Sequence, residues 1–183
     1  MGARSKARKR ALDVLYEADV RGADPRATLQ ERLAQSDPPI AAYAVTLVEG
    51  VLAHRARIDE LLSRYAVDWS LERMPPVDRN VLRLGAYEVL WSDDVPGPVA
   101  VDEAVELVRS LSTDQSPGFV NGVLGRLLQD KAELAAEERA ALPPQAEVRS
   151  EGLDGAPGVD GEHAPADELL GEGVRGGVVD HSE

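Results

Sequence analysis

The chain has 183 residues, of which 43% are hydrophobic, and its formal net charge is -13. It contains no cysteine, which excludes disulfide bonds, thiolate metal sites and a cysteine nucleophile. No apolar run approaches the roughly 20 residues of a transmembrane helix, and no signal-peptide core follows the basic N-terminus. We therefore expect a cytoplasmic protein made of one ordinary domain or two small ones.

The first half of the chain is predicted to form three helices. Residues 5–21 form the first, and an Asp-Pro pair at 24–25 opens a second that runs to about residue 35. The segment 36–39, Ser-Asp-Pro-Pro, breaks the chain and begins a long third helix. In that helix apolar residues recur at steps of three and four residues as far as Tyr65, which is the period of a buried helix face.

The second half is predicted to be helical as well. Its expected elements are a short helical turn at 70–74, helices at 76–91, 102–111 and 116–134, and connecting loops at 93–98 and 112–115. No segment shows sustained alternation of apolar and polar residues, so we predict no sheet.

These elements predict an all-α helical bundle. Two small helical subdomains, residues 1–68 and residues 69–140, are expected to share one core, because neither is large enough to be stable alone. From 141 onward Gly, Pro, Asp and Glu dominate and aromatic residues are absent. Such a segment cannot bury enough apolar surface to offset chain entropy, so 141–183 is predicted to be a disordered acidic tail.

The start of the last predicted helix, Ser-Pro-Gly-Phe-Val-Asn-Gly-Val-Leu at 116–124, has an unusual composition. Gly118, Gly122 and Gly125 each cost about 1 kcal/mol relative to Ala inside a helix. Gly118 and Gly122 share one helix face, and we expect the notch they leave to admit a neighbouring helix. Phe119, the only Phe in the chain, is expected at the exposed start of the helix, where a partner can contact it.

No constellation of residues predicts catalysis. The paired acids at 93–94 and 102–103 are interpreted as solvated loop and helix-start charges, which the helix dipole favours. The sequence contains no serine elbow and no phosphate loop, and its three histidines are not spaced for a metal site. We therefore predict a protein that is not an enzyme, with no catalytic residue, no metal and no cofactor.

A cluster of basic residues at the N-terminus predicts contact with an anion. The first ten residues hold five cations and no acid, although a helix start favours negative charge. RNA phosphates are the obvious candidate, because basic clusters neutralise them and release counterions. Tyr16 follows on the same helix and is a candidate for stacking on an unpaired base. The basic residues are Arg4, Lys6, Arg8, Lys9 and Arg10.

Four motifs, in this order along the chain, resemble the NusB family of transcription antitermination factors. The segment R-K-R-A-L-D-V-L-Y-E-A at 8–18 is similar to the family's first helix. P-P-V-D-R-N-V-L-R-L-G-A-Y-E-V-L at 75–90 is similar to its central helix, and D-V-P-G-P-V-A-V-D-E-A-V-E-L-V at 94–108 to the next loop and helix. The segment S-P-G-F-V-N-G-V-L at 116–124 is close to a family signature.

The resemblance implies an RNA-binding factor that suppresses premature termination during ribosomal RNA synthesis. Family members bind the boxA element of ribosomal RNA transcripts together with NusE, a small-subunit ribosomal protein, in an antitermination complex on RNA polymerase. The implied NusE contacts are Asp78 and Phe119. Gln115 stands where some members have an acid, and we expect the missing charge to favour RNA. The implied RNA-facing residues are Arg4, Lys6, Arg8, Lys9, Arg10, Tyr16 and Gln115.

Two alternative functions are consistent with the same sequence. One is a helical protein-interaction module with no role in RNA binding. The other is the NusB-like domain that accompanies ribosomal RNA methyltransferases, here without catalysis, since the chain leaves no room for a catalytic domain. A homodimer that hides the RNA surface is also possible on the sequence alone.

Overall fold

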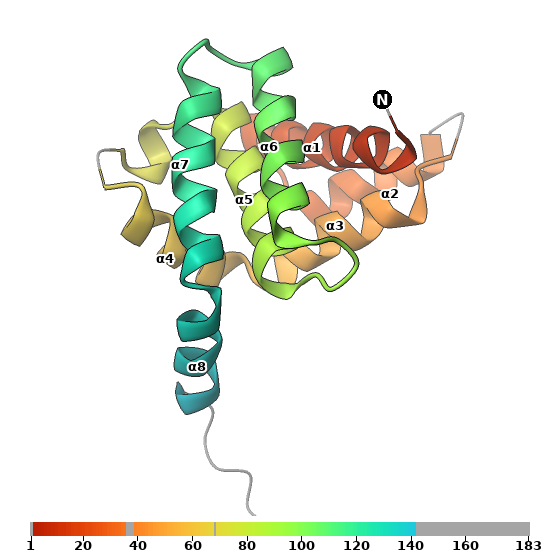
Figure 1. Cartoon of the computed structure of the whole chain (residues 1–183). Coiled ribbons are helices and arrows are strands. Elements are labelled where there is room, and N and C mark those ends of the chain that lie inside the picture. Colours follow the sequence, from red (N-terminus) through yellow and green to blue (C-terminus); the bar gives the residue numbers. More distant parts are fainter. Residues whose placement is uncertain (1, 36–38, 68, 142–183) are drawn as a thin grey trace, which may run out of the picture. The chain divides into compact units, whose positions relative to one another are not determined.

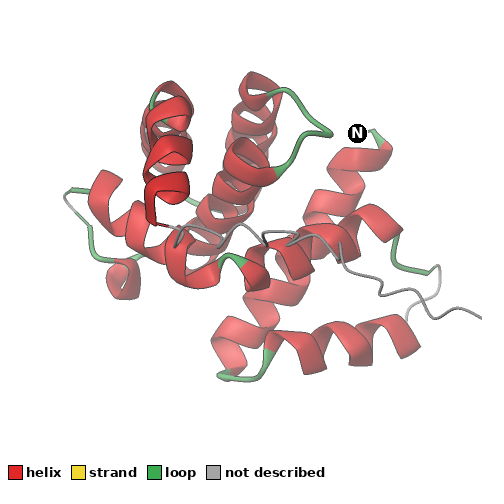
Figure 2. Ribbon diagram, turned by 90° about the horizontal axis from the view of Figure 1, so that it is seen from below, coloured by secondary structure: helices red, strands yellow, loops and turns green. Residues whose placement is uncertain are grey.

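The computed structural model describes residues 2–35, 39–67 and 69–141, and within them every regular element is a helix (Figure 2). The all-α prediction is confirmed, whereas the predicted acidic tail lies, apart from its first residue, outside the described residues. The elements are α1 (Ala3–Arg21), α2 (Pro25–Gln35), α3 (Ala42–Ala53), α4 (Arg55–Tyr65), a short 3-10 turn η1 (Leu71–Arg73), α5 (Pro76–Trp91), α6 (Gly97–Leu111), α7 (Ser116–Gln129) and α8 (Lys131–Ala141).

Helix α5 is the centre of the packing. It contacts α1, α3, α4, α6 and α7, and Figure 1 shows it among these helices. Its residues from Asn80 to Ala86 are all buried, as expected for a helix that is covered on every side. Gly85 allows a close approach of α7, because a Cβ there would lie 2.4 Å from Leu124 Cδ1. A small residue at this position of α5 therefore helps α7 to pack on it.

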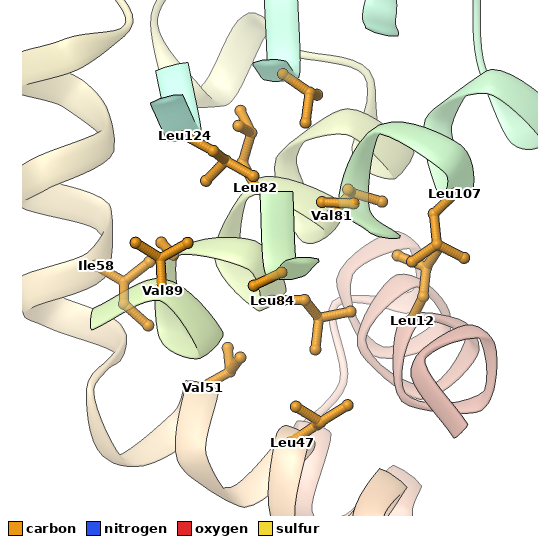
Figure 3. Packing of buried hydrophobic residues seen from close by; sticks show 14 of the residues in the cluster. Leu12, Leu47, Val51, Ile58, Val81, Leu82, Leu84, Val89, Leu107 and Leu124 are labelled. Atoms are coloured by element: carbon orange, nitrogen blue, oxygen red, sulfur yellow. The ribbon is translucent and has the colours of Figure 1, made fainter. Parts of the chain in front are cut away.

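The buried apolar side chains form one cluster around α5. Figure 3 shows how Leu12 of α1, Leu47 of α3, Leu107 of α6 and Leu124 of α7 lie near the α5 residues Val81, Leu82, Leu84 and Val89. The described residues also belong to one compact unit. A boundary between two subdomains near residue 68 stays a prediction.

The predicted long third helix is wrong, because two helices occupy that stretch. The break is a single residue, His54, whose backbone has φ -104° and ψ 11°. Its ring stacks on Trp91, with 4.4 Å between ring centroids. Both α3 and α4 contact α5, so the break at His54 turns each apolar face toward the same central helix. The spacing of three and four residues between apolar side chains continues across His54, so the sequence pattern does not reveal the break.

Two helix ends also differ from the prediction. Helix α6 begins at Gly97 rather than at residue 102, and Pro98 lies in its first turn, where a missing N–H removes no helical hydrogen bond. Helix α7 ends at Gln129, and α8 continues after Asp130 (Figure 1). Tyr65 Oη donates a hydrogen bond of 2.7 Å to Asp130 Oδ2, which ties this break to the end of α4.

The glycines of α7 do not admit a neighbouring helix, so that expectation was wrong. A Cβ added at Gly118, Gly122 or Gly125 would meet no other group within 4 Å. The opposite face of α7 is buried through Val120, Val123, Leu124 and Leu127. The glycine face of α7 is therefore open, and packing within the described part of the chain does not explain it.

Candidate functional site

Two exposed cations in the first half of α1 have no ion-pair partner among the described residues. The first turn contains no acidic residue, and Gly2 at the N-cap supplies no side-chain cap. Lys6 and Arg10 are exposed, and neither has an ion-pair partner among the described residues. Lys9 is paired with Asp13 one turn later, with 2.5 Å between Nζ and Oδ1. Lys6 and Arg10 are therefore the cations most available to an external anion.

Arg4 is exposed but held at the surface. Its Nη1 donates a hydrogen bond of 2.8 Å to the backbone oxygen of Asp94, in the loop before α6. Its guanidinium carbon also lies 5.4 Å from the centroid of the Tyr43 ring. Arg4 keeps its charge at the surface, while its position is fixed by groups from two other parts of the fold.

Arg8 does not face solvent, which corrects its prediction as an RNA contact. Its side chain is buried, with 2% of the residue's surface exposed. Arg8 Nε and Nη2 each donate a hydrogen bond of 2.8 Å to the carboxylate of Glu88 on α5. A charge with these contacts is satisfied inside the protein. The reason for the difference is that Arg8 lies on the face of α1 that packs on α5, unlike Lys6 and Arg10.

Further polar groups enclose the Arg8–Glu88 pair. Tyr43 Oη of α3 donates to Glu88 Oε1, and Arg8 Nη1 lies 3.1 Å from Glu103 Oε2 of α6. Burial and the hydrogen bond to Glu88 raise the pKa of Tyr43. Burial alone would lower the pKa of Arg8, but the hydrogen bond and charge of Glu88 raise it. This network of four side chains joins α1 to α3, α5 and α6.

Tyr16 lies on the exposed side of α1, where 40% of its surface is accessible. Arg8, on the same helix, is buried, so Arg8 and Tyr16 do not share an exposed face. Tyr16 instead lines a cavity between α1 and α2, and Arg10 lines the same cavity. The structure therefore brings together Arg10 and Tyr16 among the predicted RNA-facing residues.

Asp78, Gln115 and Phe119 lie around a second cavity, of about 310 Å³, where the α4–α5 connection faces the start of α7. We call it the aromatic hollow. Phe119 and Trp69 form its apolar wall, with ring centroids 5.6 Å apart and planes at 75°. Trp69 is 42% exposed. Gln115 was predicted to face RNA, and it lies beside the predicted partner contacts.

Asp78 is not a surface residue, which corrects the way it was expected to meet a partner. It is 1% exposed, and Ser116 Oγ donates a hydrogen bond of 2.7 Å to its Oδ2. Its Oδ1 is buried without a hydrogen-bond partner among the described residues. A buried acceptor left without a donor costs about 1–3 kcal/mol. Asp78 therefore lines the aromatic hollow with a carboxylate of which one oxygen is buried and unpaired in the described part of the chain.

Sequence reasoning missed three residues of these sites. Glu88 lies among the apolar residues of the second half of α5, and an acid at a buried position of a helix needs a buried cation. That signal was available. Tyr43 carried no comparable signal, because its hydroxyl meets Glu88 only through tertiary packing. Trp69 precedes the Pro-Pro start of α5, and its contact with Phe119 on α7 is likewise set by the fold.

Other kinds of site find no support in the described ranges. No group of three or more His, Cys, Asp or Glu side chains there is placed to hold a metal ion. None of the helices in that part of the chain is long and apolar enough to cross a membrane.

The chain is similar in sequence to known antitermination proteins. The model of the NusB family matches residues 5–129. The transcription antitermination protein NusB of Saccharopolyspora erythraea is 63% identical over 145 residues, which cover 78% of this chain and 98% of the relative. NusB of Streptomyces coelicolor is 52% identical over 142 residues, which cover 75% of this chain and all of the relative.

The fold is also similar to that of solved NusB structures. NusB of T. maritima superposes with a TM-score of 0.65 at 34% identity, over 75% of this chain and 98% of that chain. A structure of the antitermination factors NusB and NusE in complex with dsRNA gives a TM-score of 0.61 at 30% identity, over 69% of this chain and 96% of that chain. Because the family model matches more than half of the sequence and the relatives are covered almost completely, this chain belongs to the NusB family.

Proposed function

We propose that this protein is an RNA-binding transcription antitermination factor, which binds boxA RNA of ribosomal RNA transcripts together with NusE. The observation that carries the proposal is the pair Lys6 and Arg10, exposed and without ion-pair partners in the described ranges, on a helix fixed by a buried network. The names of the relatives support it, as does the solved complex of NusB, NusE and RNA.

The RNA contact is chiefly electrostatic. Lys6 and Arg10 neutralise phosphates, and Arg4 and Lys9 add positive charge beside them, although Lys9 shares its charge with Asp13. Arg8 does not touch RNA in this account. It positions α1 through Glu88, so that the exposed cations keep a fixed spacing. A net charge of -13 does not oppose this contact, because screening over about 8–10 Å lets a local basic cluster act alone.

NusE docks on the aromatic hollow in this proposal. Trp69 supplies exposed aromatic surface beside the partly buried Phe119, and interfaces favour aromatic residues at their centre. Asp78 contributes indirectly, because its buried carboxylate accepts a hydrogen bond from Ser116 at the start of α7, the helix that carries Phe119. Gln115 lies at the edge of the same hollow, so RNA that reaches it passes beside the bound NusE.

The protein then acts as a non-catalytic adaptor within an antitermination complex on RNA polymerase. RNA and NusE occupy different parts of its surface, and their joint binding builds one composite surface. Its RNA ligands are nascent transcripts, so we expect the protein to act in the cytoplasm.

The test of RNA binding is a titration of single-stranded boxA RNA into the full chain and into Lys6→Ala/Arg10→Ala. We expect the double variant to bind several-fold more weakly and to reduce the slope of log affinity against log salt by about 2, one for each lost phosphate contact. The matched control is Lys131→Ala/Arg139→Ala on α8, which removes the same charge from another helix and should leave the slope unchanged. Equal slopes for the two double variants would contradict the proposal.

NusE docking is tested separately by Phe119→Ala. Loss of a central aromatic contact typically weakens an interface by about 2 kcal/mol or more, so NusE affinity should fall at least about 30-fold. RNA binding without NusE should stay at the level of the unchanged chain. If the chain binds NusE but no RNA at any salt concentration, it is a protein-interaction module only.

A further inference from the structure

The aromatic hollow has two walls that come from segments far apart in the chain. The α4–α5 connection supplies Ala66, Val67 and Trp69, while α7 supplies Phe119 and Arg126. The hollow has its shape only while the connection is held at one place against α7. The contacts that hold the connection there therefore decide whether a partner meets a formed site.

Apolar packing holds the α4–α5 connection weakly. Of its three residues on the hollow, Ala66 is buried, but Val67 is 77% exposed and Trp69 is 42% exposed. The ring of Trp69 contacts Phe119 across the hollow. Segments that bury few apolar contacts open locally at a low cost in free energy. Polar contacts to the connection are therefore needed to keep Trp69 in place.

Arg126 of α7 bonds the end of α4, where the connection begins. Its Nη2 donates a hydrogen bond of 2.7 Å to the backbone oxygen of Tyr65, the last residue of α4. The last carbonyl groups of a helix have no partner within it, and the helix dipole favours a cation near them. Directly after Tyr65, the backbone oxygen of Ala66 accepts a hydrogen bond of 3.1 Å from Trp69 N–H. A short turn of backbone thus links the guanidinium of Arg126 to Trp69.

A second hydrogen bond fixes the same residue of α4. Tyr65 Oη donates to Asp130 Oδ2, directly after α7, at 2.7 Å. Tyr65 is therefore held by its backbone through Arg126 and by its side chain through Asp130. Arg126 is exposed and lines the hollow, so it reaches Tyr65 from the wall of the site itself.

We propose that Arg126 is the positioning residue of the aromatic hollow. Its bond to Tyr65 fixes the α4–α5 connection, so that Trp69 faces Phe119 before a partner arrives. This inference rests on the proposed function, in which NusE docks on the hollow. A preformed site binds more tightly, because binding does not then bear the cost of ordering it. In a variant whose hollow is formed in only about one molecule in ten, the affinity for NusE falls about tenfold.

The experiment compares Arg126→Gln with Arg139→Gln, each in the full chain. Both arginines donate from Nε to the backbone oxygen of the residue one turn earlier, Arg126 to Gly122 and Arg139 to Ala135. The two variants lose the same charge and the same local bond, and Arg126→Gln also loses the bond to Tyr65. We expect Arg126→Gln to bind NusE about tenfold more weakly and Arg139→Gln to bind it like the unchanged chain. Arg126→Lys keeps a charged donor and should recover most of the affinity.

Fluorescence of Trp69 separates positioning from direct contact with NusE. The chain has two tryptophans, so quenching of Trp69 by acrylamide is measured in a Trp91→Phe background, which keeps an aromatic ring beside His54. Without NusE, Arg126→Gln should make Trp69 easier to quench, because its wall of the hollow is released. Arg139→Gln should leave the quenching unchanged.

Three results would decide against parts of this account. Weaker NusE binding by Arg126→Gln with unchanged quenching of Trp69 would mean that Arg126 contacts NusE itself, and it would overturn the inference. Full NusE affinity in Arg126→Gln would also overturn it, and a lowered unfolding temperature would then assign Arg126 to stability alone. No NusE binding by the unchanged chain would reject the proposed function, and the quenching of Trp69 would then decide alone whether Arg126 forms the hollow.

Discussion

Arg8 of α1 and Glu88 of α5 form a buried ion pair with two parallel hydrogen bonds, each 2.8 Å long. A guanidinium and a carboxylate joined in this way fix both distance and orientation. The pair therefore sets where α1 lies on the central helix. Since the exposed cations Lys6 and Arg10 flank Arg8 on the same helix, the pair also sets where they are presented.

We expect Glu88→Gln to lower the free energy of unfolding by about 3 kcal/mol, because Arg8 is left as a buried charge without its counter-ion. Urea denaturation measures this change. Glu106→Gln is the control, since Glu106 and its partner Arg109 are both exposed, and it should cost less than about 1 kcal/mol. If the two variants lose similar free energies of unfolding, the buried pair contributes no more to stability than the exposed one.

The glycines of α7 and α3 should respond in opposite ways to alanine. Gly122 faces open space, so Gly122→Ala should stabilise the protein by up to about 1 kcal/mol through helix propensity. A Cβ at Gly50 would lie 2.0 Å from Tyr87 Cζ, so Gly50→Ala should destabilise it by about 1–3 kcal/mol. Thermal unfolding of both variants checks the contrast, and a destabilised Gly122→Ala would show that the open face is structurally required.

Part of this arrangement follows from the sequence and part does not. The Pro-Pro pair at 75–76 predicts the start of α5, the resemblance to the NusB family implies that this helix is central, and the structure agrees with both. The sequence does not predict that Lys6 is exposed and Arg8 is buried, because both are cations in one basic run. Only the contact of Arg8 with Glu88 in the folded protein distinguishes them. The break at His54 and the contact between Trp69 and Phe119 likewise depend on packing between distant segments.

A second buried arginine predicts how stability depends on pH. Arg83 donates hydrogen bonds of 2.7 Å and 3.0 Å to Asp59, and Arg55 donates a third of 2.8 Å. Burial would raise the pKa of Asp59, but these hydrogen bonds hold it below its ordinary value. The folded state thus binds this proton less tightly than the unfolded state. Its stabilisation is complete above the unfolded pKa and is lost as pH falls through the folded pKa.

Asp59→Asn should therefore lower the free energy of unfolding by about 2–3 kcal/mol at pH 7, since Arg83 loses its charged partner. It should also flatten the decline in stability between about pH 5 and pH 2. Urea denaturation at several pH values gives both quantities. If the variant loses stability between about pH 5 and pH 2 as steeply as the unchanged chain, other carboxylates are responsible for that loss.

Gln115→Asp should weaken RNA binding, because it adds a negative charge at the exposed N-cap of α7, beside the aromatic hollow. The expected effect is a few-fold at low salt and smaller at high salt, as screening requires. Titration of boxA RNA at two salt concentrations measures it. If the variant and the unchanged chain bind RNA equally well at low salt, Gln115 does not face RNA.

In the proposed function, RNA and NusE bind this protein at neighbouring parts of its surface, and each favours the binding of the other. The most direct measurement is a salt-dependent titration of boxA RNA into the full chain, with and without saturating NusE. We predict that NusE raises RNA affinity about 5- to 150-fold, the range of a coupling free energy of about 1–3 kcal/mol. An RNA affinity that is the same with and without bound NusE would contradict the claim.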